Sequence, residues 1–320
     1  MTERENMQLV WDHKQPEWVP AIVKASQMLI TPEINDRPLF MDGTDWFGLD
    51  WRIDPKNPNL MTHLKPGQCL FNDISDWRKH FSFPSVKDLN WEMIGQRTKA
   101  MWKKKDELMG YCVGNMGGFE RLCAAMNHEN GLTAFCLDID ACTDFMEAYA
   151  GYRIEQFGYI KKYMDPDFMM MHDDWGNQNN MFISPEMWRA SCKEPVRRMA
   201  KACHDLGMYY MHHSCGYIEP IIGDLAEIGV DSWHGGAPSN NLAKIKAEHG
   251  DKLIFAGCVD PQVTDAPGVT EEDVRADVRR AIDVLGKNGG LMISSAVMFS
   301  IMPGVDNIII DECTKYGKYN

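Results

Sequence analysis

The sequence contains 320 residues, 44% of them hydrophobic and 25% charged, which is the composition of a globular chain long enough to bury a large core. Its formal net charge is −13. This acidity argues against nucleic acid or an anionic membrane as the main partner, because both bind basic surfaces.

Residues 1–18 show no charged segment followed by an apolar one, so no secretion signal is predicted. The sequence contains no run of about 18 apolar residues, so no membrane-spanning helix is expected. The ten cysteines are scattered without a C-x-x-C pair. In a chain of this length without a secretion signal, that pattern predicts reduced thiols and a cytoplasmic protein.

The first hundred residues predict an irregular N-terminal cap. Residues 42–59 and 62–84 are dense in Gly, Pro, Asp and aromatic residues, which favours loops and short turns. A helical pattern over 88–108 follows, with Asp88 or Asn90 available as its N-cap. Because no repeat, low-complexity tract or long polar linker interrupts the sequence, we expect residues 1–320 to form one barrel domain, with 1–100 as its cap.

From residue 168 onward, five short apolar runs alternate with helical patterns. The runs span residues 168–172, 208–213, 230–234, 252–258 and 290–295, and the helical patterns span 184–206, 218–229, 240–250, 270–289 and 305–317. Repeated strand–helix units predict a parallel sheet buried on both faces. We therefore expect an α/β protein with a (β/α)8 TIM barrel, and a doubly wound sheet is the alternative. No G-x-G-x-x-G motif follows any run, which disfavours a nucleotide-binding sheet.

Polar residues capable of chemistry follow each of these runs. In a parallel barrel the carboxyl ends of the strands open on one face, where active sites lie. His213 and Cys215 are two residues apart, so at a strand end their side chains point the same way. An imidazole and a thiolate together suit zinc. Cys258, two runs later, is the candidate third ligand, and His234 is a reserve ligand or a support for one.

Each of these residues also has a purely structural interpretation. A strand-end histidine can be a hydrogen-bonded core residue, and a cysteine can be a small buried hydrophobe. Asp173 and Asp174 face opposite sides of an extended segment, so one is a candidate general acid or orienting carboxylate while the other braces a neighbouring element. His212 is a candidate substrate contact. A Cys–His nucleophile pair is disfavoured, because residues two apart in an extended segment do not readily hydrogen-bond through their side chains.

Several segments resemble the uroporphyrinogen decarboxylase superfamily, whose members are (β/α)8 barrels. The similarity extends from about residue 105 to the last residue and rests on "DDWGNQNNMFISPEMWR", "HSCGYIEPIIGDLAEIGVD" and "GDKLIFAGCVDP". The arginine-rich N-terminal signature of the decarboxylase itself is missing. In its place, "DWFGLDW" and residues 64–92 resemble the methyltransferase I components of corrinoid-dependent O-demethylases.

This resemblance implies an enzyme that moves a methyl group from a methoxylated aromatic compound to Co(I) of a corrinoid protein, with a metal, usually zinc, on the substrate oxygen. Coordination of that oxygen would stabilise its developing negative charge, and a nearby acid such as Asp173 or Asp174 would protonate it. The expected partners are a corrinoid protein that carries the cobalamin and an aromatic methyl ether. A homodimer is kept as a further option.

The sequence departs from the zinc methyltransferase pattern at one place. Those proteins follow H-x-C, matched here by His213 and Cys215, with a later cysteine near the last strand, whereas residues 296–298 read Ala-Val-Met in this chain. The resemblance then offers Cys258 as the substitute ligand, with His234 in reserve. Two alternatives stay open: a metal-free decarboxylase or other lyase of the same superfamily, and a non-catalytic paralogue that only binds a corrinoid or an aromatic ligand.

Overall fold

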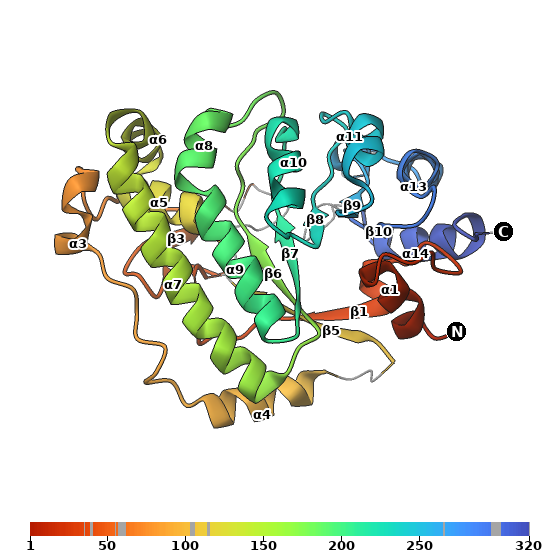
Figure 1. Cartoon of the computed structure of the whole chain (residues 1–320), viewed down its shortest axis with the longest axis horizontal. Helices are drawn as coiled ribbons and strands as arrows, with labels where there is room; N and C mark the ends of the chain where they lie inside the picture. The colour runs from red at the N-terminus through yellow and green to blue at the C-terminus, as the bar shows by residue number, and fades with distance from the viewer. Residues whose placement is uncertain are drawn as a thin grey trace.

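Seven parallel strands form the central sheet of this computed structural model, in the order β1-β5-β6-β7-β8-β9-β10. Figure 1 shows that the sheet curls and that helices lie around its outer side. The strands are β1 (Ser26–Leu29), β5 (Leu108–Val113), β6 (Phe168–His172), β7 (Tyr209–His213), β8 (Ser232–His234), β9 (Ile254–Cys258) and β10 (Leu291–Ser294). The structure describes residues 1–34, 36–38, 41–54, 56, 62–102, 106–113, 116–264, 266–295 and 302–319.

The two edges of the curled sheet meet at the segment that leads into β1. Ala21 forms a parallel bridge with Ile293 of β10, and the Ile293 amide donates to the Pro20 carbonyl at 2.9 Å. A few residues later, β1 pairs with β5. Residues 20–29 therefore include β1, which forms one edge of the sheet, and also contact β10, which forms the other edge. The predicted α/β barrel is confirmed. Of its eight predicted strands, seven lie in this sheet among the described residues.

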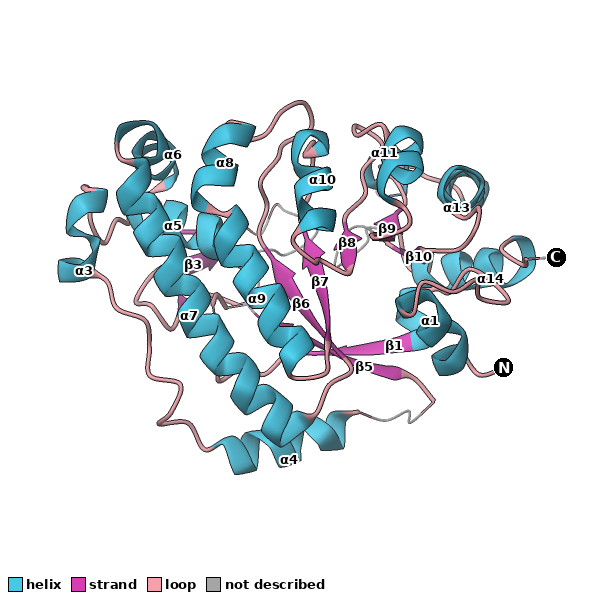
Figure 2. Cartoon of the chain, in the orientation of Figure 1, coloured by secondary structure: helices cyan, strands magenta, loops and turns pink. Residues whose placement is uncertain are grey.

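Helices cover the outer face of the sheet, as Figure 2 shows. Those of the barrel are α5 (Gly118–Met126), α6 (His128–Leu137), α7 (Ile139–Met164), α8 (Pro185–Ser191), α9 (Lys193–Asp205), α10 (Glu219–Glu227), α11 (Leu242–His249), α12 (Pro261–Thr264), α13 (Glu271–Leu285) and α14 (Val305–Tyr316). The N-terminal region adds α1 (Glu3–Trp11), α2 (Ile22–Ala25), the short 3-10 helix η1 (Ile74–Asp76), α3 (Trp77–His80) and α4 (Trp91–Met101). Within the described part of the chain, none of these helices is long and apolar enough to span a bilayer.

All five apolar runs predicted from the sequence become strands, β6 to β10. The helical pattern over 184–206 instead forms two helices. The Ser184 side chain accepts a hydrogen bond from the Met187 amide, and Pro185 stands in the first turn of α8, where its missing N–H costs nothing. Pro195 has no N–H to donate to the Ser191 carbonyl. The helix accordingly stops before Cys192 and restarts as α9.

The predicted cap contains both barrel and non-barrel structure. β1 lies within residues 1–100 and joins the central sheet. The helix expected over 88–108 is shorter, because α4 ends at Met101 and residues from 108 onward form β5; Asn90 is its N-cap, accepting from the Met93 amide. Beside the barrel, β2 (Gly43–Thr44), β3 (Asp50–Ile53) and β4 (Thr62–Leu64) form a small antiparallel sheet.

Two buried arginines fasten this N-terminal region to the barrel helices. Arg121 of α5 donates to Asp45 at 2.7 Å, and both side chains are fully buried. Arg153 of α7 pairs with Asp36 and donates to the Tyr149 hydroxyl at 2.7 Å. Each charge is therefore neutralised by a partner from the other part of the structure, which fixes how the small sheet sits on the barrel.

Removing one partner of such a pair should destabilise the fold strongly. Arg153→Met leaves the Asp36 carboxylate buried without its counter-charge, so we expect a loss of about 3–5 kcal/mol in the free energy of unfolding. Arg78→Met removes an ion pair with Asp144 whose side chains are 60% and 48% exposed, and it should cost less than about 1 kcal/mol. Urea unfolding followed by tryptophan fluorescence measures both, and equal losses would contradict this description of the contact.

Candidate metal centre

Three histidines stand side by side where neighbouring strands end. His172 is the last residue of β6, His213 the last of β7 and His234 the last of β8. The parallel register pairs His172 with His213 and His213 with His234. The rings of His172 and His213 stack with centroids 4.6 Å apart, and those of His213 and His234 lie 4.8 Å apart. The row therefore lies at the carboxyl ends of the strands, where barrel enzymes place their active sites.

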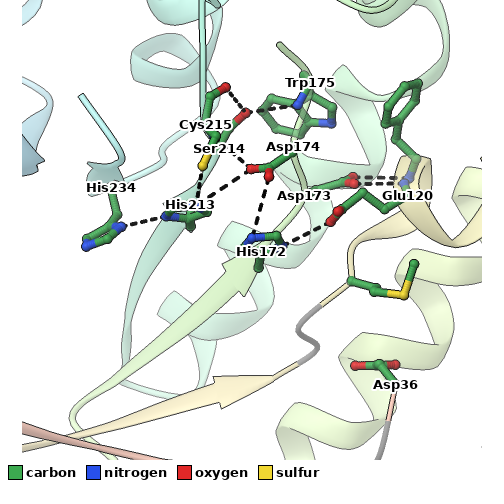
Figure 3. A network of polar contacts seen from close by, with 12 residues as sticks. Asp36, Glu120, His172, Asp173, Asp174, Trp175, His213, Ser214, Cys215 and His234 are labelled. Carbon is green, nitrogen blue, oxygen red and sulfur yellow. Dashed lines mark hydrogen bonds and ion pairs between the residues drawn. The ribbon is translucent and has the colours of Figure 1, made fainter. Parts of the chain in front are cut away.

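Asp174 joins two of these histidines. Its Oδ2 lies 3.7 Å from His172 Nε2, and its Oδ1 lies 3.6 Å from His213 Nε2. One ligand atom from each of the three residues lies within 4.8 Å of the others, so the group could hold a metal ion. Figure 3 shows the carboxylate of Asp174 pointing into the space between the two rings.

The other nitrogen of each ring is held by a neighbour. His172 Nδ1 lies 3.0 Å from Glu120 Oε2, and His213 Nδ1 lies 2.6 Å from His234 Nδ1. His234 is held in turn by Ser294 Oγ, 3.0 Å from its Nε2. These contacts orient both Nε2 atoms towards Asp174. A hydrogen-bond partner on the second ring nitrogen commonly fixes the orientation of a metal-binding histidine in this way.

The electrostatics of the group differ from one histidine to the next. Burial opposes protonation of His172, yet Asp174 and Glu120 raise its pKa to about 9. Burial alone would raise the pKa of Glu120, but the His172 charge lowers it. Without a metal, an imidazolium thus balances the two carboxylates, and a metal cation could replace that proton.

His213 and His234 are held neutral. Burial, reinforced by the charge of His172, lowers the pKa of His213 well below its usual value. The same two causes lower the pKa of His234 to about 4. A neutral imidazole keeps the lone pair that binds a metal, so His213 needs no proton loss to serve as a ligand.

The donor set fits zinc. Zinc binds imidazole nitrogen and carboxylate oxygen at about 2.0–2.2 Å, which places the ligand atoms of a tetrahedral site about 3.4 Å apart. The two Nε2 atoms lie 3.7 and 3.6 Å from different oxygens of Asp174, which is near that spacing. Three protein ligands would leave a fourth position for another molecule, the arrangement of catalytic zinc sites.

Cys215 borders the group without belonging to it. Its Sγ lies 3.1 Å from His213 Nε2, and its backbone amide donates to Asp174 Oδ1 at 2.7 Å. Desolvation and the Asp174 carboxylate raise the pKa of the thiol. That Cys215 is itself a metal ligand stays a prediction, for which the 3.1 Å approach of its Sγ to His213 Nε2 is the supporting contact.

Cys258 ends β9, the strand next to β8, but its thiol is packed outside the row of histidines. Its side chain is fully buried, and its Sγ donates to the Ala256 carbonyl at 3.5 Å. A Cβ added to Gly236 would stand 2.8 Å from that sulfur, so the thiol is packed against the Gly236 backbone. Burial raises its pKa to about 12. The metal-capable group found among the described residues does not include it, and the residues at 296–298 that lack the expected cysteine lie outside those residues.

The two remaining sequence candidates point away from the group. Asp173 accepts hydrogen bonds from the Phe119 and Glu120 amides at 3.1 and 3.0 Å, so it holds the first turn of α5. The His212 ring stacks on Trp175 with centroids 4.2 Å apart. Burial raises the pKa of Asp173 to about 7, helped by Glu120, and lowers that of His212 to about 3. Of the adjacent aspartates, Asp174 is the one that meets the candidate ligands.

A cavity of about 330 Å³ opens beside the group. Glu120 and Asp174 line one part of it, and the rings of Trp51, Phe119 and Phe182 line another. Arg37, from the N-terminal region, also faces it. The small N-terminal sheet therefore supplies part of the wall, because Trp51 belongs to β3.

Sequence reasoning selected His213, His234 and Asp174, which the structure brings together, but it missed His172 and Glu120, which join the same group. His172 could have been found, since it ends an apolar run in the same way as His213. Glu120 follows no such run: it lies in the first turn of α5 and reaches His172 only through the fold.

The fold and the site define an α/β-barrel protein with a candidate metal centre at the carboxyl ends of its strands. The family model described as Uroporphyrinogen decarboxylase (URO-D) matches residues 100–308, more than half of the chain. The chain therefore belongs to the uroporphyrinogen decarboxylase family. Among proteins of curated function, sequence comparison finds no match.

Solved structures support the fold. A methyltransferase from Methanosarcina mazei is similar over 99% of this chain and 99% of its own, with a TM-score of 0.71 and 12% sequence identity. A sugar phosphate isomerase/epimerase from Parabacteroides distasonis covers 70% of this chain and 77% of its own, with a TM-score of 0.37 and 9% identity. The first similarity extends the shared fold to the N-terminal region, and the second is too low to carry an argument.

Metal content tests the ligand set directly. Because His213 and Asp174 supply ligand atoms, His213→Ala and Asp174→Asn should each remove bound zinc from protein purified without oxygen. Cys258→Ser is the matched control and should keep about one zinc per chain. Plasma mass spectrometry gives the ratio. Retention of zinc in His213→Ala together with its loss in Cys258→Ser would contradict this ligand set and assign the zinc to cysteine ligands instead.

Proposed function

We propose that this protein transfers a methyl group from a methoxylated aromatic compound to Co(I) of a separate corrinoid protein, with a zinc ion held by His172, Asp174 and His213. One observation carries the proposal: Asp174, one residue of the metal-capable group, and a set of aromatic rings line the same cavity. A flat apolar substrate with one ether oxygen suits both parts of that wall. The fold shared with a methyltransferase is consistent with it.

The proposed reaction breaks the bond between the ether oxygen and the methyl carbon. Both electrons of that bond stay on oxygen, and the methyl carbon bonds to Co(I), which is oxidised by two electrons to methyl-Co(III). A zinc ion in this group would act as a Lewis acid that stabilises the phenolate leaving group. The corrinoid is a reactant brought by the partner protein, and the cytoplasmic location predicted from the sequence suits such a pair.

The residues of the chain would divide the remaining tasks. Glu120 and His234 keep the His172 and His213 rings turned so that both Nε2 atoms face Asp174. The aromatic walls hold the ring of the substrate and exclude water from the oxygen that becomes charged. Asp174 lines the cavity, and as a zinc ligand it would be ionised, so the phenolate would leave the metal by taking a proton from water.

A second candidate is metal-free decarboxylation of an aromatic acid in the same cavity. Arg37 favours it, because that chemistry needs a cation to bind the carboxylate and Arg37 faces the cavity. The products separate the two reactions. Incubation of 4-methoxybenzoate yields 4-hydroxybenzoate and methyl-cobalt if the proposal is right, and anisole with carbon dioxide if the second candidate is right.

The proposal predicts corrinoid methylation in vitro. Wild-type protein with zinc, reduced corrinoid protein and a methoxyarene should produce methyl-Co(III) absorbance and an equal amount of phenol. His213→Ala should slow the reaction at least about 100-fold, since Lewis-acid stabilisation is worth several kcal/mol. His204→Gln, which changes a histidine that is paired with Asp231 on the outer surface, should leave the rate unchanged.

Two results would contradict the proposal. One is the absence of methyl-cobalt with the cognate corrinoid protein across a panel of methoxyarenes, even when zinc is bound. The other is a rate in His213→Ala equal to that of the wild type. Ligand-induced stabilisation without any turnover would instead support the non-catalytic paralogue.

A further inference from the structure

A chain of hydrogen bonds leads from the end of β10 to the candidate metal centre. The Ser294 hydroxyl donates to the Ser295 carbonyl at 3.0 Å, and the same Ser294 oxygen lies 3.0 Å from His234 Nε2. On the other side of that ring, His234 Nδ1 lies 2.6 Å from His213 Nδ1, as Figure 3 shows. His213 Nε2 then faces Asp174 Oδ1 at 3.6 Å. The chain therefore connects the ends of β10, β8 and β7 with a candidate ligand atom.

The direction of this chain follows from its β10 end. A serine hydroxyl has one proton, and that of Ser294 is used in the bond to the Ser295 carbonyl, so the Ser294 oxygen can only accept from His234. His234 Nε2 therefore carries a proton. Within the described part of the chain no carboxylate pairs with His234, so its ring is neutral and has a single N–H. Its Nδ1 is then bare and accepts the hydrogen bond that His213 Nδ1 donates.

The His213 ring consequently holds its proton on Nδ1 and presents a lone pair at Nε2. The contact on the metal side agrees with this direction: the Cys215 thiol lies 3.1 Å from Nε2 and has an S–H to donate to a bare nitrogen. A metal binds the ring nitrogen that has no proton. In the opposite tautomer, a proton on Nε2 would face Asp174 and would have to leave before zinc could bind.

The sheet leaves room for the link between His234 and Ser294. These residues end β8 and β10, and β9 lies between the two strands. At this level β9 has Gly257, which pairs with Ile293, and a Cβ added there would stand 3.5 Å from His234 Nε2. A larger side chain would grow into the path of the hydrogen bond. Ser294 and His213 are 4% and 5% exposed, so water hardly competes for the two ends of the chain.

We propose that Ser294 sets the tautomer of His213. Ser294 is a positioning residue: acting through His234, it keeps the His213 proton on Nδ1 and leaves Nε2 ready to bind zinc. This inference rests on the zinc site of the proposed function, and it extends the residues that prepare the site to β10.

Nitrogen-15 NMR of the histidine rings tests the direction of the chain in the metal-free protein. The chemical shift of a ring nitrogen distinguishes an N–H from a bare nitrogen, and His213→Ala and His234→Phe assign the two rings. We expect a protonated Nδ1 and a bare Nε2 for His213, and the reverse for His234. Ser294→Ala removes the acceptor of the His234 proton, so both tautomers of each ring should become populated. Ser294→Thr keeps the hydroxyl and should restore the wild-type pattern.

Zinc affinity provides a second readout, measured at one fixed pH by competition with a colour-forming chelator. His234→Phe removes the acceptor for the His213 proton and should raise the Kd for zinc about 10–100-fold, the usual effect of losing the partner behind a histidine ligand. His234→Asn offers a side-chain oxygen in place of Nδ1 and should recover most of the affinity. Ser294→Ala should give a Kd between that of the wild type and that of His234→Phe.

Ser295→Ala is the matched control. It makes the same change one residue later, at a hydroxyl that donates to Asp306 Oδ1 at 3.4 Å, and it leaves the backbone carbonyl that Ser294 needs. The NMR pattern and the Kd should equal those of the wild type. Melting temperatures verify that each variant is folded, and the wild-type spectrum alone tests the direction of the chain if the Ser294 variants do not fold.

Three outcomes would overturn the inference. They are a proton on His213 Nε2 in the metal-free wild type, a His213 tautomer that Ser294→Ala leaves unchanged, and an equal rise in Kd in Ser294→Ala and Ser295→Ala. Failure here is distinguishable from failure of the proposed function. If methyl transfer proceeds in a protein whose His213 carries its proton on Nε2, the function stands and the role of Ser294 is wrong. If no methyl is transferred but the NMR pattern and the zinc affinity depend on Ser294, the converse holds.

Discussion

The site depends on the register between three parallel strands. Because β6, β7 and β8 end level with one another, His172, His213 and His234 form a row at the mouth of the barrel. A shift of one residue in any strand would turn its histidine to the other face of the sheet. Asp174 then lies between two of the rings, while Glu120 and His234 hold the nitrogens that face away from it. The histidines are thus placed by the register of the sheet itself.

The N-terminal region forms part of the cavity wall beside the candidate metal centre. The pairs of Arg121 with Asp45 and of Arg153 with Asp36 bury four charges between the two parts. Such pairs contribute little net stability but define one arrangement, because any other would leave charges buried without partners. That arrangement brings Trp51 and Arg37 to the cavity beside the candidate metal centre. The barrel therefore supplies the ligand atoms, and the N-terminal region supplies part of the surface that would select a substrate.

The sequence predicted the barrel, and it named part of the group of residues that the structure brings together, for identifiable reasons. Strands β6 to β10 are apolar runs followed by helices, and this alternation is visible in the sequence, so the fold class and the row containing His213 and His234 could be predicted. β1 is only four residues long and begins with the polar Ser26 and Gln27, so its sequence gives no clear strand pattern. The contact between Glu120 and His172 joins residues 52 positions apart, and no local pattern predicts it. Cys258 matched a motif, but the positive φ of 66° at this residue and its packing against Gly236 are properties of the folded chain.

X-ray absorption at the zinc edge of the wild-type protein tests the central claim most directly, because it identifies the atoms bound to the metal. Coordination by His172, Asp174 and His213 predicts two imidazole nitrogens and a carboxylate oxygen at about 2.0–2.2 Å, with at most one sulfur, from Cys215, at about 2.3 Å. A first shell with two sulfurs would assign the ligands to Cys215 and Cys258 and contradict the site described by this structure. A protein that takes up no zinc at all would contradict the metal centre itself.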